Sequence, residues 1–280
     1  MSDPPDGTIQ FIVPIGIDFG RVKSGIMYWH GKGKVPNLLY LPVSKEWIGD
    51  PKYEKLVLKP LQKWLKDLPD KYGFKTQFEI HPLENIDDYK KGFQYLLAKM
   101  KELRNADHKS TIYIDSTSAP KTWLLAAMRV IPFFPRVVIY HVKSGMTPKD
   151  YSEEQISDKG GETKTIEVGS ECDEILEELV LGDGKHSLLF KELFTKSGPS
   201  REAIKTEEFI DPLVEKMPDR YGGRGRENTH KAVTVSFREL ADAGQLVEVV
   251  GPGGKKRVRL TEGGFLVGEA LYPAQGPPKA

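Results

Sequence analysis

Apolar and polar residues alternate in long blocks along the first half of the chain. Short, almost wholly apolar runs predict strands over residues 9–17, 37–43, 75–83, 111–115 and 135–144. A helix is predicted over GIMYWH, residues 25–30, and segments whose apolar residues recur every three or four positions predict helices over residues 51–68, 85–105 and 121–131. Apolar strands that alternate with helices indicate a parallel sheet covered on both faces. The fold class predicted for residues 10–145 is therefore α/β, a Rossmann-like domain with a mostly parallel sheet.

The pattern changes after residue 145. Residues 146–180 lose the helical period, gain glycine and charge, and are predicted to be a linker with one short strand, KTIEV. Helices are predicted over residues 186–198 and 201–217, the second interrupted before Pro212, and a third helix ends near Gly244. Two strands, 246–250 and 257–261, flank a glycine-rich turn, and a last helix covers residues 262–271. This order predicts a winged helix-turn-helix domain over residues 181–272, with a disordered lead at 1–9 and a tail at 273–280.

The composition narrows the functional classes. The chain has 280 residues, a formal net charge of +1 and one cysteine, so no internal disulfide is possible and a reducing cytoplasm is predicted. No apolar run approaches the roughly 20 residues of a membrane helix, and the first residues lack the features of a signal peptide. The histidines are scattered without metal-ligand spacing, and we expect neither a metal nor a cofactor.

A polar loop, DSTSAPK at residues 115–121, joins a buried strand to an apolar helix. Ligands of open α/β sheets bind at the carboxyl ends of the strands, where this loop lies. Its hydroxyls and amides offer donors to an anion, and the start of the helix adds free N–H groups. Capping of the helix by Ser118 is the alternative, but it accounts for only one hydroxyl. The predicted ligand-binding residues here are Ser116, Thr117, Ser118 and Lys121.

Another loop, GIDFGRVKSG at residues 16–25, is predicted beside the first. Its glycines permit a tight backbone, and Arg21 and Lys23 are suited to binding phosphates. The loop is neither G-x-G-x-x-G nor a Walker sequence, so NAD and ATP are not supported. The letters VKSG recur at residues 142–145, where Lys143 is a further candidate on the same rim.

Basic residues concentrate in the second domain. Nine lysines and arginines stand against four acidic residues between Arg220 and Arg259. This excess lies on the predicted recognition helix and wing, which favours double-stranded DNA as the partner; a protein-binding winged helix is the alternative. The predicted DNA-contacting residues are Arg224, Arg226, Asn228, Thr229, His230, Lys231, Lys255, Lys256 and Arg257.

Two segments, FIVPIGIDFGRV and YIDSTSAPKTWLLAAM, resemble the CARF family, the CRISPR-associated Rossmann folds. Residues 186–271 resemble the winged helix that several members carry, so the resemblance covers most of the chain. It implies a homodimer that binds a cyclic oligoadenylate, with cyclic tetra-adenylate favoured, in type III CRISPR defence. Carried over by position, it adds Asp18, Phe19 and Arg21 as ligand contacts. Some members have small hydroxyl residues where Asp18 and Phe19 stand, and this departure bears on the ring size.

The sequence thus predicts a cyclic oligoadenylate-sensing, homodimeric DNA-binding transcriptional regulator. The alternative is an enzyme, a metal-independent ring nuclease in which Lys121, Ser24 and Ser116 act on the bound ring. That chemistry needs an in-line ribose hydroxyl and a cation, but no histidine is clearly placed as general base, so turnover should be slow. A third possibility is an interaction module whose winged helix binds protein.

Overall fold

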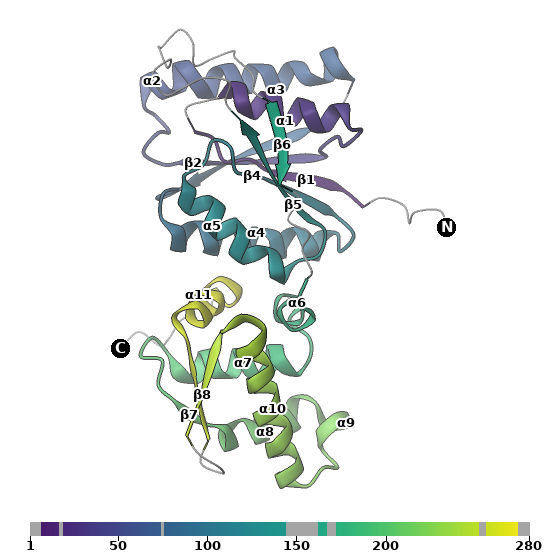
Figure 1. Ribbon diagram of the computed structural model, residues 1–280, viewed down its shortest axis with the longest axis vertical. Coiled ribbons are helices and arrows are strands. Elements are labelled where there is room, and N and C mark those ends of the chain that lie inside the picture. The colour runs from purple at the N-terminus through teal and green to yellow at the C-terminus, as the bar shows by residue number, and fades with distance from the viewer. Residues whose placement is uncertain are drawn as a thin grey trace, which may run out of the picture. The chain divides into compact units, whose positions relative to one another are not determined.

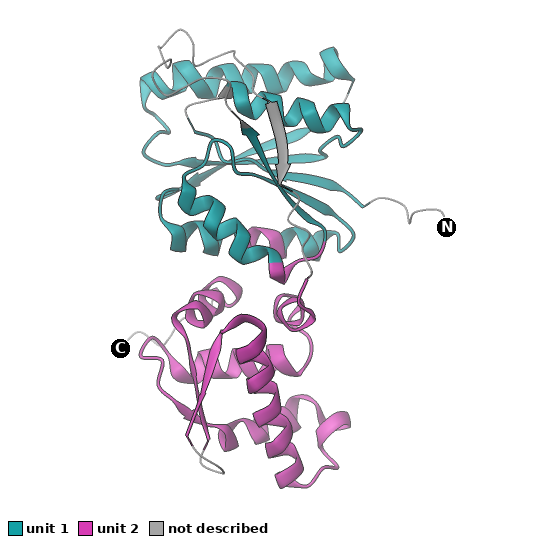
Figure 2. Ribbon diagram, viewed as in Figure 1, with its two compact units in different colours: residues 1–96, 102–131, 136–170 teal, residues 97–101, 132–135, 171–280 magenta. Residues whose placement is uncertain are grey.

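The computed structural model describes residues 7–16, 19–73, 76–143, 162–166, 172–251 and 256–273. For Phe19, Lys143 and residues 162–166 it describes the backbone alone. The chain divides into two compact units, coloured separately in Figure 2. Unit 1 comprises residues 1–96, 102–131 and 136–170, and unit 2 comprises residues 97–101, 132–135 and 171–280.

Unit 1 is built on a six-stranded sheet with the order β3-β2-β1-β4-β5-β6. The first five strands are parallel and β6 runs antiparallel to β5. The strands are β1 (Ile9–Ile12), β2 (Leu38–Ser44), β3 (Gln77–Leu83), β4 (Thr111–Asp115), β5 (Val137–Lys143) and β6 (Glu162–Ile166). This confirms the predicted α/β fold with a Rossmann-like, mostly parallel sheet, and β6 is the short strand predicted near KTIEV.

Helices cover both faces of this sheet (Figure 1). On one face lie α1 (Phe19–Gly31) and α3 (Lys59–Tyr72), and on the other lie α4 (Tyr89–Ala106) and α5 (Lys121–Val130). The short α2 (Pro51–Tyr53) and a π-helical turn, Glu54–Leu58, lead into α3. Because both faces are covered, β1, β2, β4 and β5 bury most of their side chains, which explains their near-continuous apolar sequences, whereas β3 at the edge of the sheet buries none completely.

The first helix begins earlier than the pattern predicts. Residues 16–25 are expected to be a loop, but the helix α1 already includes Phe19, so Arg21 and Ser24 lie in its first turns. Gly25 allows this helix to approach β5, since a Cβ there would lie 2.7 Å from the Tyr140 ring. The glycines of this segment therefore serve helix–sheet packing as well as the turn.

Unit 2 contains helices and a three-stranded antiparallel sheet with the order β7-β9-β8. Its elements are α6 (Glu174–Leu181), α7 (Lys185–Ser197), β7 (Ile204–Lys205), α8 (Ile210–Lys216), α9 (Pro218–Tyr221), α10 (Arg226–Gly244), β8 (Val247–Val250), β9 (Arg257–Leu260) and α11 (Glu262–Leu271). The predicted hairpin and last helix are thus confirmed. The helix predicted over residues 201–217 is confirmed only in its second part, as α8: residues 204–205 form β7, and a 3-10 turn, Thr206–Phe209, precedes α8.

Some predicted features lie outside the described residues. They include Asp18, Lys255, the side chains of Phe19 and Lys143, most of the predicted linker at 146–180, and most of the predicted lead and tail. None of the helices in the described part of the chain has the length and hydropathy that a membrane-spanning helix needs.

Candidate functional site

The carboxyl ends of β1 and β4 bring the two predicted loops of unit 1 together. These strands are neighbours in the sheet, with Ile12 opposite Ile114. The chain beyond β1 stays attached to β2 through hydrogen bonds from Val13 N to Tyr40 O and from Ile15 N to Pro42 O, at 2.8 and 2.9 Å. Gly16 then packs directly against the carbonyl group of Ser118 in the second loop, at a distance that leaves no room for a Cβ. The two loops therefore form one site, as the sequence predicts.

Two hydroxyls of the second loop hold the loop to β5. Ser116 is 5% exposed, and its Oγ donates to Tyr140 O at 3.0 Å. Thr117 is 6% exposed, and its Oγ1 accepts a hydrogen bond from Val142 N at 2.8 Å. Both side chains thus have a structural role, and their predicted contact with a ligand stays a prediction.

Ser118, Pro120 and Lys121 lie at the accessible part of the same loop. Pro120 is the N-cap of α5 and not its first helical residue, and its side chain makes no capping hydrogen bond. Ser118 lies two residues before the N-cap, and its role as a cap stays a prediction. Ser118 is half-buried and Lys121 is exposed at the first position of α5. Since the first N–H groups of a helix lack intrahelical partners, Lys121 and the start of α5 offer donors to an anion.

A buried carboxyl group, Asp115, underlies the loop. Its Oδ1 accepts a hydrogen bond from Thr117 N at 2.6 Å, and within the described residues its Oδ2 has no partner. Burial raises the pKa of Asp115 to about 6, while hydrogen bonds from Thr117 and the nearby charge of Arg21 oppose this rise. The Tyr140 hydroxyl approaches the same carboxyl without the geometry of a full hydrogen bond, and burial raises its pKa too. The effect of Arg21 on Asp115 places the start of α1 beside the end of β4.

His141 was not selected from the sequence, but the structure places it at this site. Its Nδ1 lies 3.5 Å from Oγ of Ser116, and the ring is half-buried. The only signal for it is its position next to the recurring VKSG, one residue beyond the end of the pairing between β5 and β4. Ser24, the other predicted hydroxyl, donates to Gly20 O at 3.1 Å within α1.

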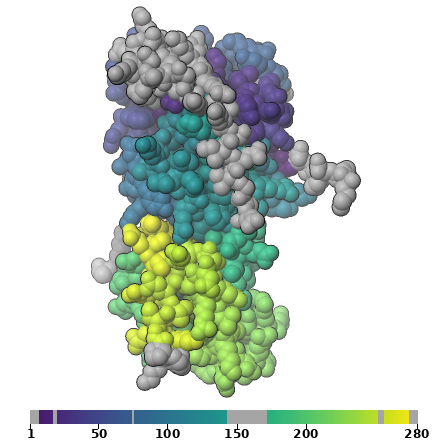
Figure 3. Space-filling view, in the orientation of Figure 1, coloured from purple at the N-terminus to yellow at the C-terminus, as the bar shows by residue number. Residues whose placement is uncertain are grey.

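In unit 2, the structure divides the predicted DNA contacts into exposed and buried residues. Arg224, Arg226, Asn228, Lys231 and Arg257 are exposed, and Lys256 is half-buried. α10 and the β8–β9 hairpin, lime to yellow, adjoin on one face of this unit (Figure 3).

One of the predicted DNA contacts, Thr229, is wrong by position, and the contact predicted for His230 stays a prediction. Thr229 is fully buried, and its hydroxyl bonds Gly225 O at 3.4 Å. His230 is half-buried, with Nε2 bonded to the Thr206 hydroxyl at 2.8 Å. Adjacent helix positions point about 100° apart, so four consecutive residues cannot all face DNA. Thr229 and His230 hold the helix in place.

Four of the exposed basic side chains already have partners. Arg226 pairs with Asp211 at 3.2 Å, and Lys231 pairs with Glu227 at 2.9 Å. Arg220 and Arg224 lie 5.8 and 5.2 Å from the centre of the Tyr221 ring. All are at the surface, where such pairs contribute little stability and are readily exchanged for phosphate.

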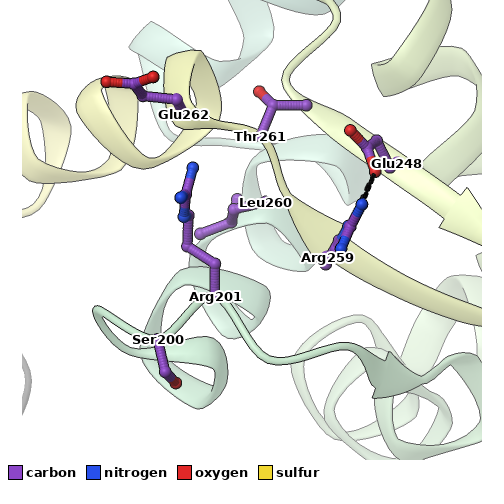
Figure 4. Close-up of a pocket in the computed structure, with 7 residues that line it drawn as sticks. All are labelled: Ser200, Arg201, Glu248, Arg259, Leu260, Thr261 and Glu262. Atoms are coloured by element: carbon purple, nitrogen blue, oxygen red, sulfur yellow. Dashed lines mark hydrogen bonds and ion pairs between the residues drawn. The ribbon is translucent and has the colours of Figure 1, made fainter.

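Unit 2 also has a cavity of about 240 Å³ at the base of the hairpin (Figure 4). The side chain of Arg201 extends in it toward the start of α11, while Arg259 is held by Glu248 at 2.6 Å. Two arginines and two glutamates line the cavity, so its charges balance. Within the described ranges, no three His, Cys, Asp or Glu side chains are arranged to hold a metal ion.

The geometry of unit 1 thus defines a Rossmann-like protein with a composite loop site at the carboxyl edge of its sheet. No protein-family model and no curated protein matches the sequence. Solved structures that resemble the chain include Csm6 of Enterococcus italicus bound to cyclic hexa-2'-fluoro-hexa-dAMP, with 10% identity and a TM-score of 0.44, over 85% of this chain and 56% of that one. Another is protein VC1899 of Vibrio cholerae, with 11% identity and a TM-score of 0.34, over 94% of this chain and 65% of that one. The chain spans less than two thirds of either protein, and neither likeness bears on what it binds.

Proposed function

We propose that this chain is a CARF-type sensor of cyclic oligoadenylate that regulates transcription in type III CRISPR defence. The observation that carries the proposal is the contact of Gly16 with Ser118, which joins two loops at the carboxyl ends of adjacent strands. Arg21 and Lys121 bring positive charge to this rim, where the phosphates of the ligand would bind. The sequence DSTSAPK, which resembles that of CARF proteins, forms the loop itself.

A second copy of the chain completes the proposed site. A cyclic oligonucleotide with an even number of nucleotides can lie on the two-fold axis of a homodimer, so that each protomer contributes the same loops. We favour cyclic tetra-adenylate as the ring. The ligand would act by binding one arrangement of the dimer more tightly than another, because only differential affinity shifts such an equilibrium.

For unit 2 we propose a winged helix that binds double-stranded DNA. The order α7, β7, α8, α10 and the β8–β9 hairpin supports this, with α10 as the recognition helix and the hairpin as the wing. The exposed basic residues before and within α10 suit the phosphate backbone.

Isothermal titration calorimetry with cyclic tetra- and hexa-adenylate tests the ligand site. We expect Lys121→Ala to weaken binding at least about tenfold, because hydrogen bonds to charged groups contribute about 1.5–3 kcal/mol. The control is Lys66→Ala, an equally exposed lysine on α3, which should bind as the wild type does. No heat with any cyclic adenylate, or a monomer at all concentrations, would contradict the sensor.

A ring nuclease is the second candidate, and the position of His141 favours it. Its Nδ1 lies 3.5 Å from Ser116 Oγ, at the site where Lys121 would stabilise developing charge. Incubation with labelled cyclic tetra-adenylate distinguishes the two functions. Linear products that the wild type forms and His141→Ala does not form would favour the nuclease. Ligand that stays intact after long incubation would favour the sensor function without cleavage.

A further inference from the structure

One face of α10 is exposed and has no packing role. Four of its exposed residues, Asn228, Lys231, Val235 and Arg238, follow a spacing of three or four, which places them within about 80° of one another around the helix, and the exposed Asp242 lies on the same face near the end of the helix. The opposite face is buried, with Thr229, Val233, Ser236, Phe237 and Leu240 all at most 1% exposed. The helix therefore presents a single stripe of side chains to a partner.

Val235 is the unusual member of this stripe. It is 47% exposed, and it is the only large apolar residue of α10 that the structure leaves so accessible. A β-branched side chain in the middle of an exposed helix gains little from packing and lowers helix propensity. Lys231 lies one turn before it and Arg238 one turn after it, while Glu239, also one turn after it, is bonded to Lys185 and His186. An apolar side chain within a positively charged surface is suited to double-stranded DNA, whose backbone is anionic and whose major groove contains the apolar methyl groups of thymine.

Arg238 lies three residues beyond Val235 on the same face. It is exposed, and it forms no ion pair within the described part of the chain. Three residues of helix advance roughly 4.5 Å, close to the roughly 3.4 Å rise of one base pair. The two side chains are thus spaced to meet adjacent base pairs.

We infer that Val235 and Arg238 determine the base specificity of this protein. Val235 contacts the methyl group of a thymine in the major groove, and Arg238 donates two hydrogen bonds to O6 and N7 of a guanine at the adjacent pair. Arg220 and Arg224, outside the stripe, bind phosphate and carry no sequence information. The inference rests on the proposed DNA binding and deepens it by naming the residues that read the sequence.

This assignment of base specificity is tested by selecting bound duplexes from a randomised DNA library with the full-length chain. The selection compares wild type with Val235→Ala, Arg238→Ala and Arg224→Ala. We expect Val235→Ala and Arg238→Ala to lose preference at one base pair each, at adjacent positions. The loss of discrimination at the arginine position should be roughly 5- to 150-fold, the range for a bidentate contact. Arg224→Ala should keep the same preferred sequence, with uniformly weaker binding and a salt slope smaller by about one.

The outcomes separate the two levels of the proposal. If Val235→Ala and Arg238→Ala select the wild-type sequence while Arg224→Ala still binds more weakly, DNA binding stands and the specificity assignment fails. If the wild-type chain enriches no duplex at low salt, the proposed DNA function fails and the assignment fails with it. Thermal unfolding of Val235→Ala should match or exceed the wild type, because alanine raises helix propensity and the buried face is unchanged.

Discussion

The backbone of Gly16 lies directly against the carbonyl group of Ser118, and a Cβ on Gly16 would collide with that oxygen. From the other side, the buried Tyr53 hydroxyl donates toward the carbonyl oxygens of Ile15 and Gly16, at 3.1 and 3.3 Å. The end of β1 is thus held between α2 and the loop after β4. This contact turns two loops that are distant in sequence into one candidate site.

Replacement of Gly16 by alanine should therefore separate the loops. We expect Gly16→Ala to lower the free energy of unfolding by about 1–3 kcal/mol through overpacking, and to weaken cyclic tetra-adenylate binding measured by calorimetry. Gly31→Ala is the matched control, because Gly31 ends α1 with no atom within 4 Å of its Cβ position. Equal behaviour of the two variants would show that the Gly16 contact does not shape the site.

The buried Asp115 should make unit 1 less stable as pH rises. Burial raises its pKa from 3.8 to about 6, so the folded chain holds this proton more tightly than the unfolded chain. The contribution of protonated Asp115 to the free energy of unfolding is fully present below about pH 4 and is lost as pH rises through 6. Asp115→Asn should be more stable than wild type at pH 7.5, by up to roughly 3 kcal/mol, and similar at pH 4.

Asp107 provides a control of opposite sign for this experiment. Hydrogen bonds from Thr8 and Lys109 hold its pKa down at about 2, so its contribution is present above the unfolded value and is lost as pH falls toward 2. Asp107→Asn should therefore destabilise at pH 7.5. Urea unfolding at the two pH values measures both variants. The prediction for Asp115 would be contradicted if Asp115→Asn were less stable than wild type at pH 7.5, because the carboxylate would then have a partner at Oδ2.

A buried histidine ties three helices of unit 2 together. His186 Nδ1 lies 2.6 Å from Glu178 Oε2, and its Nε2 lies 2.8 Å from Glu239 Oε2, to which Lys185 also bonds at 2.9 Å. Each ring nitrogen that carries a hydrogen donates it to the carboxylate beside it. His186→Phe removes both contacts and leaves the partly buried Glu178 and Glu239 without this partner, which should cost about 1–3 kcal/mol.

The pH dependence of unit 2 follows from Glu239. Hydrogen bonds from His186 and Lys185 lower its pKa, so its stabilising contribution is present above the unfolded value and lost as the solution becomes more acidic. Thermal unfolding of His186→Phe and His186→Gln from pH 4 to 8 measures this. The glutamine variant keeps one donor and should lie between wild type and phenylalanine; a wild-type transition in both variants would refute the role of the cluster.

The half-buried His230, in the first turns of α10, should affect stability and not DNA affinity. We expect His230→Ala to lower the free energy of unfolding by about 0.5–1.5 kcal/mol, the contribution of one hydrogen bond, through loss of its contact with Thr206. Its effect on the salt slope of DNA binding should be nil, whereas Arg224→Ala should reduce the slope by about one. Fluorescence anisotropy at several salt concentrations checks both. A reduced slope for His230→Ala would return this residue to the DNA interface.

The periodicity of apolar residues was sufficient to predict the parallel strands of unit 1 and most of their helices. Two errors have a common cause. The segment 16–25 looks like a loop because of its glycines, yet Gly25 lies in α1, where the absence of a side chain lets the helix reach Tyr140. The segment 201–217 has helical spacing, but Ile204 and Lys205 pair with β9. In both cases a contact with a distant strand overrides the local pattern.

By itself the sequence determined the α/β order, the carboxyl-end position of DSTSAPK and the concentration of basic residues near α10, because these depend on local period and composition. Only the tertiary structure decided which polar groups remain accessible. Ser116 and Thr117 bond to β5, Thr229 and His230 support α10, and Val235 and Arg238 face outward. Residue type fixes what a side chain can donate or accept, but the direction in which it points, and the neighbour that satisfies it, depend on strands and helices that are far away in the chain.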